Sequence, residues 1–112
     1  MKKINIVKKN TEFNDIIKNG IKYSNDLFYV YIVDNSFMYN RYGISVSKKI
    51  GNAVTRNKYK RRIKNIIDSI DIKFNKKDVV IISRPKLKLC DYNYVKENII
   101  KLFNMIGERY EK

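Results

Sequence analysis

The stretch from Lys48 to Ile70 constrains this chain most, because it has to form one long helix with a strongly positive surface. Gly51 interrupts what precedes it, Asn52 is a good N-cap, and neither Gly nor Pro occurs from Ala53 to beyond Ile70. Apolar residues recur at steps of three and four, which predicts a stripe that faces the core. These residues are Tyr59, Ile63, Ile66, Ile67 and Ile70.

A second stripe on the same predicted helix is basic. Its residues are Arg56, Asn57, Lys60, Arg61 and Lys64. No Asp or Glu occurs between Asp34 and Asp68, so the i,i+4 ion pairs that usually accompany a solvated helix face are missing. The alternative is a solvated face in a chain whose A/T-rich codons favour Lys, but Arg at positions 56, 61 and 62 argues against it. The segment therefore predicts binding to a polyanion, most simply a nucleic acid.

Length and charge limit the class of the protein. A chain of 112 residues with 44% hydrophobic residues can bury one modest core, so we expect one domain over residues 1–112, with residues 1–9 mobile. The formal net charge of +14 repels itself unless an anionic partner is bound. No apolar run approaches the roughly 20 residues of a membrane span, and the start of the chain lacks the apolar centre of a signal peptide. We therefore expect a cytoplasmic protein.

The composition argues against a catalytic site in the protein itself. The chain has no histidine, which removes the commonest general base and the commonest zinc ligand. Its acids are mostly isolated or next to Lys, with no Asp-x-Asp pair to hold two metal ions. The single cysteine, Cys90, cannot form an intramolecular disulfide and lies in no metal-ligand pattern. We expect no catalytic residue in this chain and identify no metal ligands, which leaves open whether the protein holds a metal ion.

Residues 43–64 read GISVSKKIGNAVTRNKYKRRIK. This segment resembles the signature of the protein subunit of bacterial ribonuclease P, which runs Gly-Leu-Ser-Val-Ser-Lys-Lys-x-Gly-x-Ala-Val-x-Arg-Asn-x-x-Lys-Arg-x-x-Arg. The family's positions are filled here by Lys49, Gly51, Ala53, Val54, Arg56, Asn57, Lys60 and Arg61. Lys64 stands where the family usually has Arg, which keeps the charge but loses a planar bidentate donor. The resemblance extends to VKKNTEFNDIIKNG at residues 7–20, with Val7 in place of the family's Leu.

The remaining segments predict a small α+β domain. We expect a helix over residues 11–19, capped by Asn10 and ended by Gly20, and a final helix that Asp91 or Asn93 caps and that ends at Gly107. The predicted strands are residues 21–24, 27–33, 41–47 and 79–82, the last being central because it is wholly apolar. A basic loop follows it at residues 86–90.

The predicted order, α-β-β-β-α-β-α, gives a sandwich with a four-stranded sheet. A strand, helix, strand run from residue 41 to residue 82 favours a parallel pair of strands. The general rule would make that βαβ crossover right-handed. The resemblance to the ribonuclease P protein family implies a left-handed crossover instead.

The tyrosines of the strand at residues 27–33 have two possible roles. Tyr29, Tyr31 and Val33 face one side of the strand, and Phe28, Val30 and Ile32 face the other. Either both faces are buried, or these tyrosines form an open groove with Phe13 and Ile17 of the first helix and offer flat surfaces to unstacked bases. The resemblance favours the groove, because in the family this face holds the 5′ leader of precursor tRNA. Ile17 stands where relatives often have Phe, which removes one stacking surface.

The resemblance implies an RNA-binding subunit of the endonuclease that removes the 5′ leader from precursor tRNA. The catalytic RNA subunit would carry the catalytic groups and hold Mg²⁺, and the protein, monomeric when alone, would bind that RNA and the leader. The implied RNA-binding residues are Lys48, Lys49, Asn52, Arg56, Asn57, Lys60, Arg61 and Lys64. The implied leader-binding residues are Phe13, Ile17, Tyr29 and Tyr31.

The residues alone leave two other functions open. A ribosome-associated protein or RNA chaperone would share the charge and the fold, and would bind RNA broadly. A DNA-binding regulator fits less well, because the basic stripe offers only Asn57 for reading bases and nothing suggests a dimer.

Overall fold

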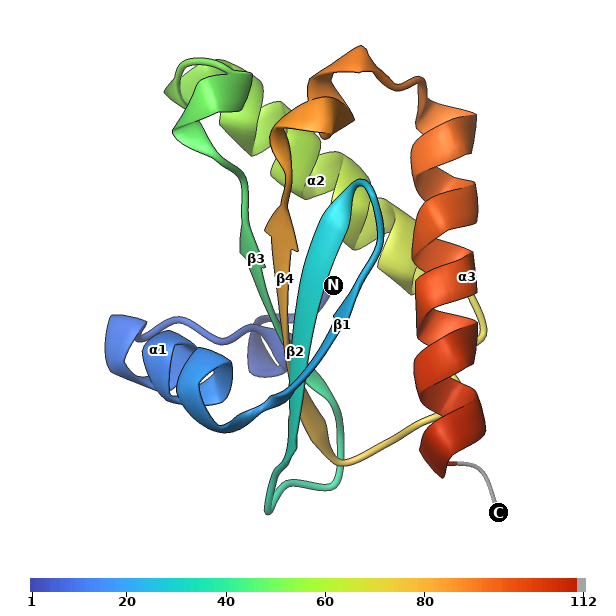
Figure 1. The fold of residues 1–112 in the computed structure, drawn as a ribbon. Coiled ribbons are helices and arrows are strands. Elements are labelled where there is room, and N and C mark those ends of the chain that lie inside the picture. The colour runs from blue at the N-terminus through green and yellow to red at the C-terminus, as the bar shows by residue number, and fades with distance from the viewer. Residues whose placement is uncertain (111–112) are drawn as a thin grey trace.

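The computed structural model describes residues 1–110, in which three α-helices pack around one four-stranded sheet (Figure 1). The helices are α1 (Asn10–Asn19), α2 (Ala53–Ser69) and α3 (Tyr92–Tyr110). The strands are β1 (Ile21–Ser24), β2 (Phe28–Asp34), β3 (Arg41–Ser45) and β4 (Lys77–Ser83), and the 3-10 turns are η1 (Lys3–Asn5), η2 (Lys48–Ile50) and η3 (Pro85–Leu89). The predicted α+β class and element order are confirmed. No helix in this described part of the chain has the length and apolar character needed to cross a membrane.

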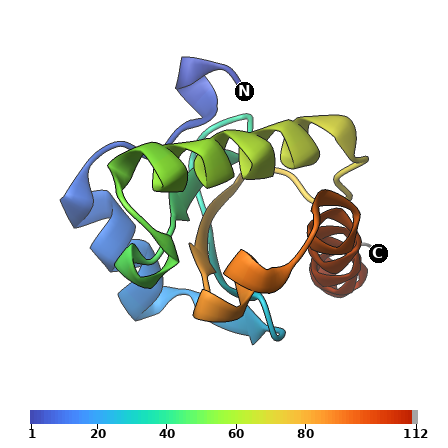
Figure 2. The same cartoon turned by 90° about the horizontal axis from the view of Figure 1, so that it is seen from above.

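The sheet has the order β1-β2-β4-β3, so β4 is central, as its apolar sequence predicted. β2 pairs antiparallel with β1 and with β4, whereas β3 pairs parallel with β4. In Figure 1, β3 lies to the left of β4 and both strands point upward, while Figure 2 shows α2, which connects them, behind the sheet. Seen from the helix side, the chain therefore moves to the left, and the crossover is left-handed, as the resemblance implied and against the general preference.

The face of the sheet that packs against α2 and α3 forms the main core. The alternate residues of β2 from Phe28 to Ile32 are at most 1% exposed and belong to one cluster with both helices. The predicted core stripe of α2 is confirmed: Ile63, Ile66 and Ile67 are buried, and Tyr59 and Ile70 pack at its edge. Burying one such large apolar side chain contributes roughly 1.5–3 kcal/mol, so this face supplies most of the stability.

Two boundaries near the basic segment differ from prediction. α1 begins at Asn10 and not after it, because Lys9 is the N-cap residue and its carbonyl accepts a hydrogen bond from Phe13 N at 3.0 Å. The prediction that Asn10 caps this helix is therefore wrong. β3 ends at Ser45, before the predicted end at residue 47, because the chain turns into η2, where Ser47 Oγ accepts from Lys49 N at 3.2 Å.

The C-terminal part also departs from prediction. The segment expected to be a basic loop forms η3, with Pro85 in its first turn, where the missing N–H costs no hydrogen bond. Asp91 is the cap of α3, since its Oδ1 accepts from Tyr94 N at 2.8 Å. The helix continues past Gly107 to Tyr110, so the predicted end is wrong. Gly107 instead permits close packing, because a Cβ there would lie 2.9 Å from Lys73 Cβ.

The N-terminal segment lies against β3. Val7 is buried, and its N–H donates to the Tyr42 carbonyl at 2.9 Å. Ile6 forms an isolated parallel bridge with Tyr42. These contacts bring α1 onto the sheet face opposite α2; the mobility of residues 1–9 stays a prediction.

Candidate nucleic-acid interface

The start of α2 is fixed by the residue expected to cap it. Asn52 Oδ1 accepts a hydrogen bond from Thr55 N at 2.9 Å, which confirms the predicted N-cap. η2 precedes this cap and is anchored by buried Ile50, while Lys48 and Lys49 are exposed. Both lysines therefore stand at the positive end of the α2 dipole and add to the positive potential there.

The basic stripe of α2 is continuous. Arg56, Lys60 and Lys64 follow one another at four-residue steps, roughly 6 Å apart along a helix axis that rises about 1.5 Å per residue. Their side chains are half-buried, whereas Asn57 and Arg61 beside them are exposed. Within residues 1–110, none of the basic side chains in this stripe forms an ion pair. A row of unpaired cations at this spacing suits a phosphate backbone.

On the opposite face of the sheet, α1 covers a smaller apolar cluster. Ile16 and Val80 are buried at its centre, with 4% and 0% exposure. Phe13, Ile17 and Tyr31 are partly buried around them. Three of the four predicted cleft residues are thus brought together in one cluster.

Tyr29, the fourth predicted cleft residue, lies beyond the cover of α1. It follows Tyr31 on the same face, one strand repeat away, and is half-exposed. Lys22 Nζ lies 4.3 Å and Arg84 Cζ lies 4.7 Å from the centre of the Tyr29 ring. Arg84 is held in place because its Nη1 donates to the Asn25 carbonyl at 2.8 Å. This sheet face is therefore buried beneath α1 and open at Tyr29, so neither predicted extreme describes it fully.

Lys22 and Arg84 were not predicted as site residues. Lys22 is opposite Tyr31 in the antiparallel pair of β1 and β2. Pairing these two predicted strands as a hairpin would therefore have placed Lys22 beside the tyrosines. Arg84 directly follows the central strand, at the end of β4 that pairs with Tyr29 through Ile82. The signal for both residues was strand pairing, which a reading of single elements does not include.

A hollow of ≈ 260 Å³ joins the basic stripe to the cleft. It lies between α1, β3 and α2 and is lined by Asn10, Phe13, Ile44, Ser45, Val46, Arg56 and Lys60. Phe13 fits here because β3 has Gly43 beneath it, where a Cβ would lie 2.7 Å from Phe13 Cε2. Arg56 Nε is buried without a hydrogen-bond partner within residues 1–110, which leaves this guanidinium with unused donor capacity.

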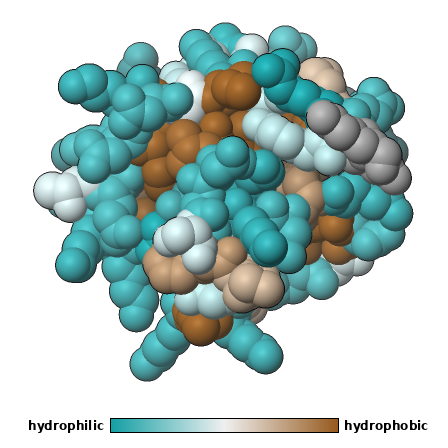
Figure 3. Space-filling view, turned by 90° about the horizontal axis from the view of Figure 1, so that it is seen from below, coloured by the Kyte–Doolittle hydropathy of each residue, from teal (hydrophilic) through white to brown (hydrophobic). Residues whose placement is uncertain are grey.

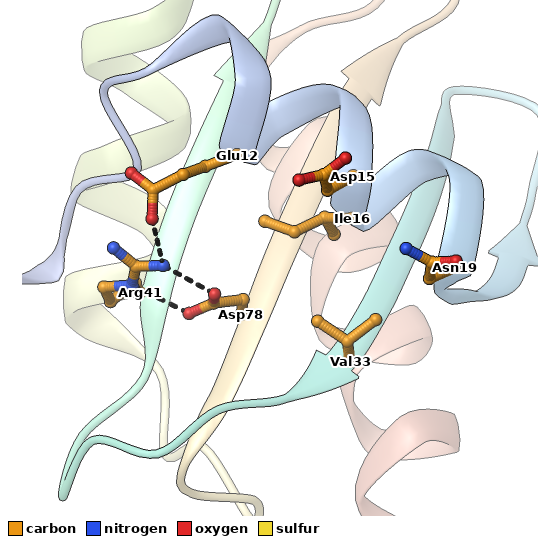
Figure 4. Close-up of a pocket in the computed structure, with 7 residues that line it drawn as sticks. All are labelled: Glu12, Asp15, Ile16, Asn19, Val33, Arg41 and Asp78. Atoms are coloured by element: carbon orange, nitrogen blue, oxygen red, sulfur yellow. Dashed lines mark hydrogen bonds and ion pairs between the residues drawn. The ribbon is translucent and has the colours of Figure 1, made fainter.

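A second hollow, of ≈ 310 Å³, lies where β3 and β4 begin (Figure 4). Arg41 Nε and Nη2 donate to Asp78 at 2.9 and 2.6 Å, and Nη2 also donates to Glu12 at 2.9 Å. Asp78 also accepts from Asn35 Nδ2 at 2.9 Å. The hydrogen bond to Asp78, assisted by Glu12 and opposed by burial, raises the pKa of Arg41 above its ordinary value. These charges satisfy one another and link α1 to the sheet.

The acidic side chains of this hollow are not arranged as a magnesium site. Within residues 1–110, no three His, Cys, Asp or Glu side chains are grouped so that they could hold a metal ion. In the acidic hollow, the Arg41 guanidinium already pairs with Glu12 and Asp78. Mg²⁺ needs oxygen ligands in near-octahedral arrangement, and this arrangement is absent there.

The lower end of the molecule has a different character. Seen from below, most of the surface is hydrophilic, and hydrophobic side chains gather in separate patches (Figure 3). The β2–β3 loop lies at this end (Figure 1) and exposes Met38 by 74%. Phe37 in the same loop stacks on Tyr39, with ring centres 5.4 Å apart. None of the predicted binding residues comes from this loop.

The family model for ribonuclease P matches residues 1–107. The chain belongs to the ribonuclease P protein family. It is 42% identical over 108 residues to the ribonuclease P protein component of Mycoplasma mycoides subsp. mycoides, which covers 95% of this chain and 99% of that protein.

Solved structures of ribonuclease P proteins have the same fold. The Staphylococcus aureus protein matches with a TM-score of 0.84 and 34% identity, over 91% of this chain and 94% of that one. The Thermotoga maritima protein matches with a TM-score of 0.79 and 32% identity, over 87% of this chain and 93% of that one.

Membership of the family confirms the predicted function. This chain is the protein component of ribonuclease P, the endoribonuclease complex of protein and RNA that processes precursor tRNA. The RNA chaperone and the DNA-binding regulator are thereby set aside. The structure brings the predicted RNA-binding residues together on η2, α2 and the α2 N-cap, and three of the four predicted leader-binding residues together where α1 packs on β2. The contact of each residue with RNA stays a prediction.

Proposed function

We propose that this chain binds two RNA segments at once: the RNA subunit along the basic stripe and the 5′ leader of precursor tRNA in the cleft. The RNA-subunit surface comprises Lys48, Lys49, Asn52, Arg56, Asn57, Lys60, Arg61 and Lys64. The leader cleft comprises Phe13, Ile17, Tyr29 and Tyr31. The observation that carries the proposal is the hollow of ≈ 260 Å³ in which Phe13 of the cleft faces Arg56 and Lys60 of the stripe.

The chemistry of the cleft suits an unpaired strand. The faces of Tyr29, Tyr31 and Phe13 are flat and partly exposed, and stacking on such rings contributes about 1–3 kcal/mol per base. Lys22 and Arg84 stand at the Tyr29 ring and would neutralise phosphates between stacked bases. This combination binds unpaired RNA with little dependence on base identity, which suits a leader of variable sequence.

We also propose that Mg²⁺ and the catalytic groups belong mainly to the RNA subunit. Within residues 1–110, six acidic residues form ion pairs, and Arg41 lies between Glu12 and Asp78 in the acidic hollow. The role of the protein is to hold the RNA subunit and precursor tRNA close together and to lower the repulsion between these two polyanions. The cytoplasmic location and the monomeric state of the free protein remain expectations from the sequence.

The test compares precursor tRNA with mature tRNA. Tyr29→Ala should weaken binding of precursor tRNA to the reconstituted complex about five- to hundredfold, as expected for the loss of one stacked base, while binding of mature tRNA is unchanged. Tyr39→Ala, which removes a tyrosine from the β2–β3 loop, is the matched control and should change neither. An equal loss for both tRNA forms would show that the cleft does not read the leader.

A further inference from the structure

α2 carries two further cations outside the basic stripe. Lys58 and Arg62 each follow a stripe residue, Arg56 and Lys60, by two positions, which is about 200° around the helix. Arg62 therefore projects from the opposite flank, whereas Lys58, three positions before Arg61, lies about 60° from that residue at the boundary of the stripe. Within residues 1–110, neither of them forms an ion pair.

This opposite flank meets the start of α3. A narrow seam between α2 and the start of α3 is lined by residues that include Tyr59, Arg62, Cys90 and Tyr92. The Arg62 guanidinium lies 5.5 Å from the centre of the Tyr59 ring, and Tyr92 is 43% exposed. The seam thus offers a planar cation beside an accessible aromatic ring.

η3 brings more positive charge to the same end of the molecule. Lys86 and Lys88 are exposed, and Cys90 Sγ donates to the Lys86 carbonyl at 3.4 Å, so the backbone of η3 lies next to the seam. Lys86 pairs with Asp26 at 3.3 Å, but both side chains are more than half exposed, so this pair is weak. The other nearby acid is Asp91, whose carboxylate caps α3. Figure 2 shows η3, the start of α3 and α2 around this upper end.

We propose that this outer surface, formed by Lys58, Arg62, Lys86, Lys88 and Tyr92, binds a second unpaired segment of RNA. One base stacks on Tyr92 beside the Arg62 guanidinium, and the lysines neutralise the flanking phosphates. RNA is the occupant because the surface is cationic and the chain is part of a complex that contains RNA. α2 would then lie between two RNA segments, one on each flank. The inference rests on membership of this complex and not on the leader cleft.

The first experiment places a photoreactive benzophenone amino acid at position 92 in the reconstituted complex. Illumination should cross-link this position to unpaired nucleotides of the RNA. The same amino acid at position 39, in the β2–β3 loop, is the control and should cross-link poorly. Equal yields at both positions, or cross-links to paired nucleotides only, would overturn the proposal.

A second experiment removes two positive charges of this surface and leaves Tyr92 unchanged. Arg62→Gln with Lys88→Gln should weaken binding to the RNA subunit and lower the slope of log K against log salt by about 1.4–1.8, for two lost phosphate contacts. The preference for precursor over mature tRNA should be unchanged, which separates this surface from the leader cleft. Lys101→Gln with Arg109→Gln removes the same charge from α3 and should leave the slope unchanged. Two results would refute an RNA site. In the first, the control variant lowers the slope as much as the test variant does. In the second, the test variant keeps the slope but loses binding to anionic phospholipid vesicles.

Discussion

Removal of two cations from the basic stripe gives the most direct test of how this protein holds RNA. Lys60→Gln with Lys64→Gln deletes both charges and leaves shorter polar side chains that keep the first two methylene groups of Lys. Both residues lie on α2, and within residues 1–110 neither has an acidic partner whose loss would unbalance the fold. We therefore expect binding to change and the free energy of unfolding to stay nearly constant.

The size of the effect follows from counterion release. Each phosphate contact contributes about 0.7–0.9 to the slope of log K against log salt, so two lost contacts lower it by roughly 1.4–1.8. Over a fourfold rise in salt concentration, the wild-type affinity should consequently fall about tenfold more than that of the variant. The measurement is a filter-binding titration against the RNA subunit at several salt concentrations.

The matched control changes the same number of charges elsewhere. Lys101→Gln with Arg109→Gln removes two exposed cations from α3. If binding depended only on net charge, this control would flatten the slope as much as the stripe variant does. Such a result would refute the reasoning, because it would show that the position of Lys60 and Lys64 on α2 is irrelevant.

Two further predictions concern stability. Arg41→Leu leaves the buried carboxylate of Asp78, which is 7% exposed, without its main partner, and should lower the free energy of urea unfolding by about 3–5 kcal/mol. Glu12→Gln breaks a more exposed pair and should lower it by less than about 1 kcal/mol. Equal losses would show that burial does not distinguish the two pairs. Burial raises the pKa of Tyr42 to about 12, which favours its neutral form in the folded state, so its contribution is complete below about pH 10 and is lost as pH rises through 12. The free energy of unfolding should fall by on the order of 2 kcal/mol over that range, and less in Tyr42→Phe; identical pH profiles would show that another group is responsible.

The sequence predicted α2 well because its signals are local. Asn52 caps the helix by accepting a hydrogen bond from the N–H of Thr55, only three residues away in sequence. The core stripe follows from helical spacing alone. The basic stripe could be found for the same reason, since its residues lie on one helix. The error at Gly107 has the opposite origin, because this glycine packs against Lys73, which lies far away in sequence.

The parts that sequence did not predict depend on contacts between elements. Arg41 and Asp78 are 37 residues apart, and their pairing follows from the parallel register of β3 and β4. Lys22 on β1 and Arg84 after β4 reach the Tyr29 ring because both strands pair with β2. The left-handed crossover could be expected from the resemblance only, because hydrophobic periodicity carries no information about handedness.

The two cations next to the Tyr29 ring limit how much binding free energy a leader base gains by stacking on it. A cation within about 6 Å of the centre of an exposed ring contributes roughly 0.5–1 kcal/mol. The charged groups of Lys22 and Arg84 both lie within that distance of the Tyr29 ring. A base that stacks on a ring face covered by one of these cations displaces it, so part of the stacking energy of about 1–3 kcal/mol is offset. The displaced cation can then pair with the phosphate of the same nucleotide. Lys22 is free to do so on its exposed strand, whereas Arg84 is tethered to Asn25, so Lys22 is the cation that should move when the leader binds.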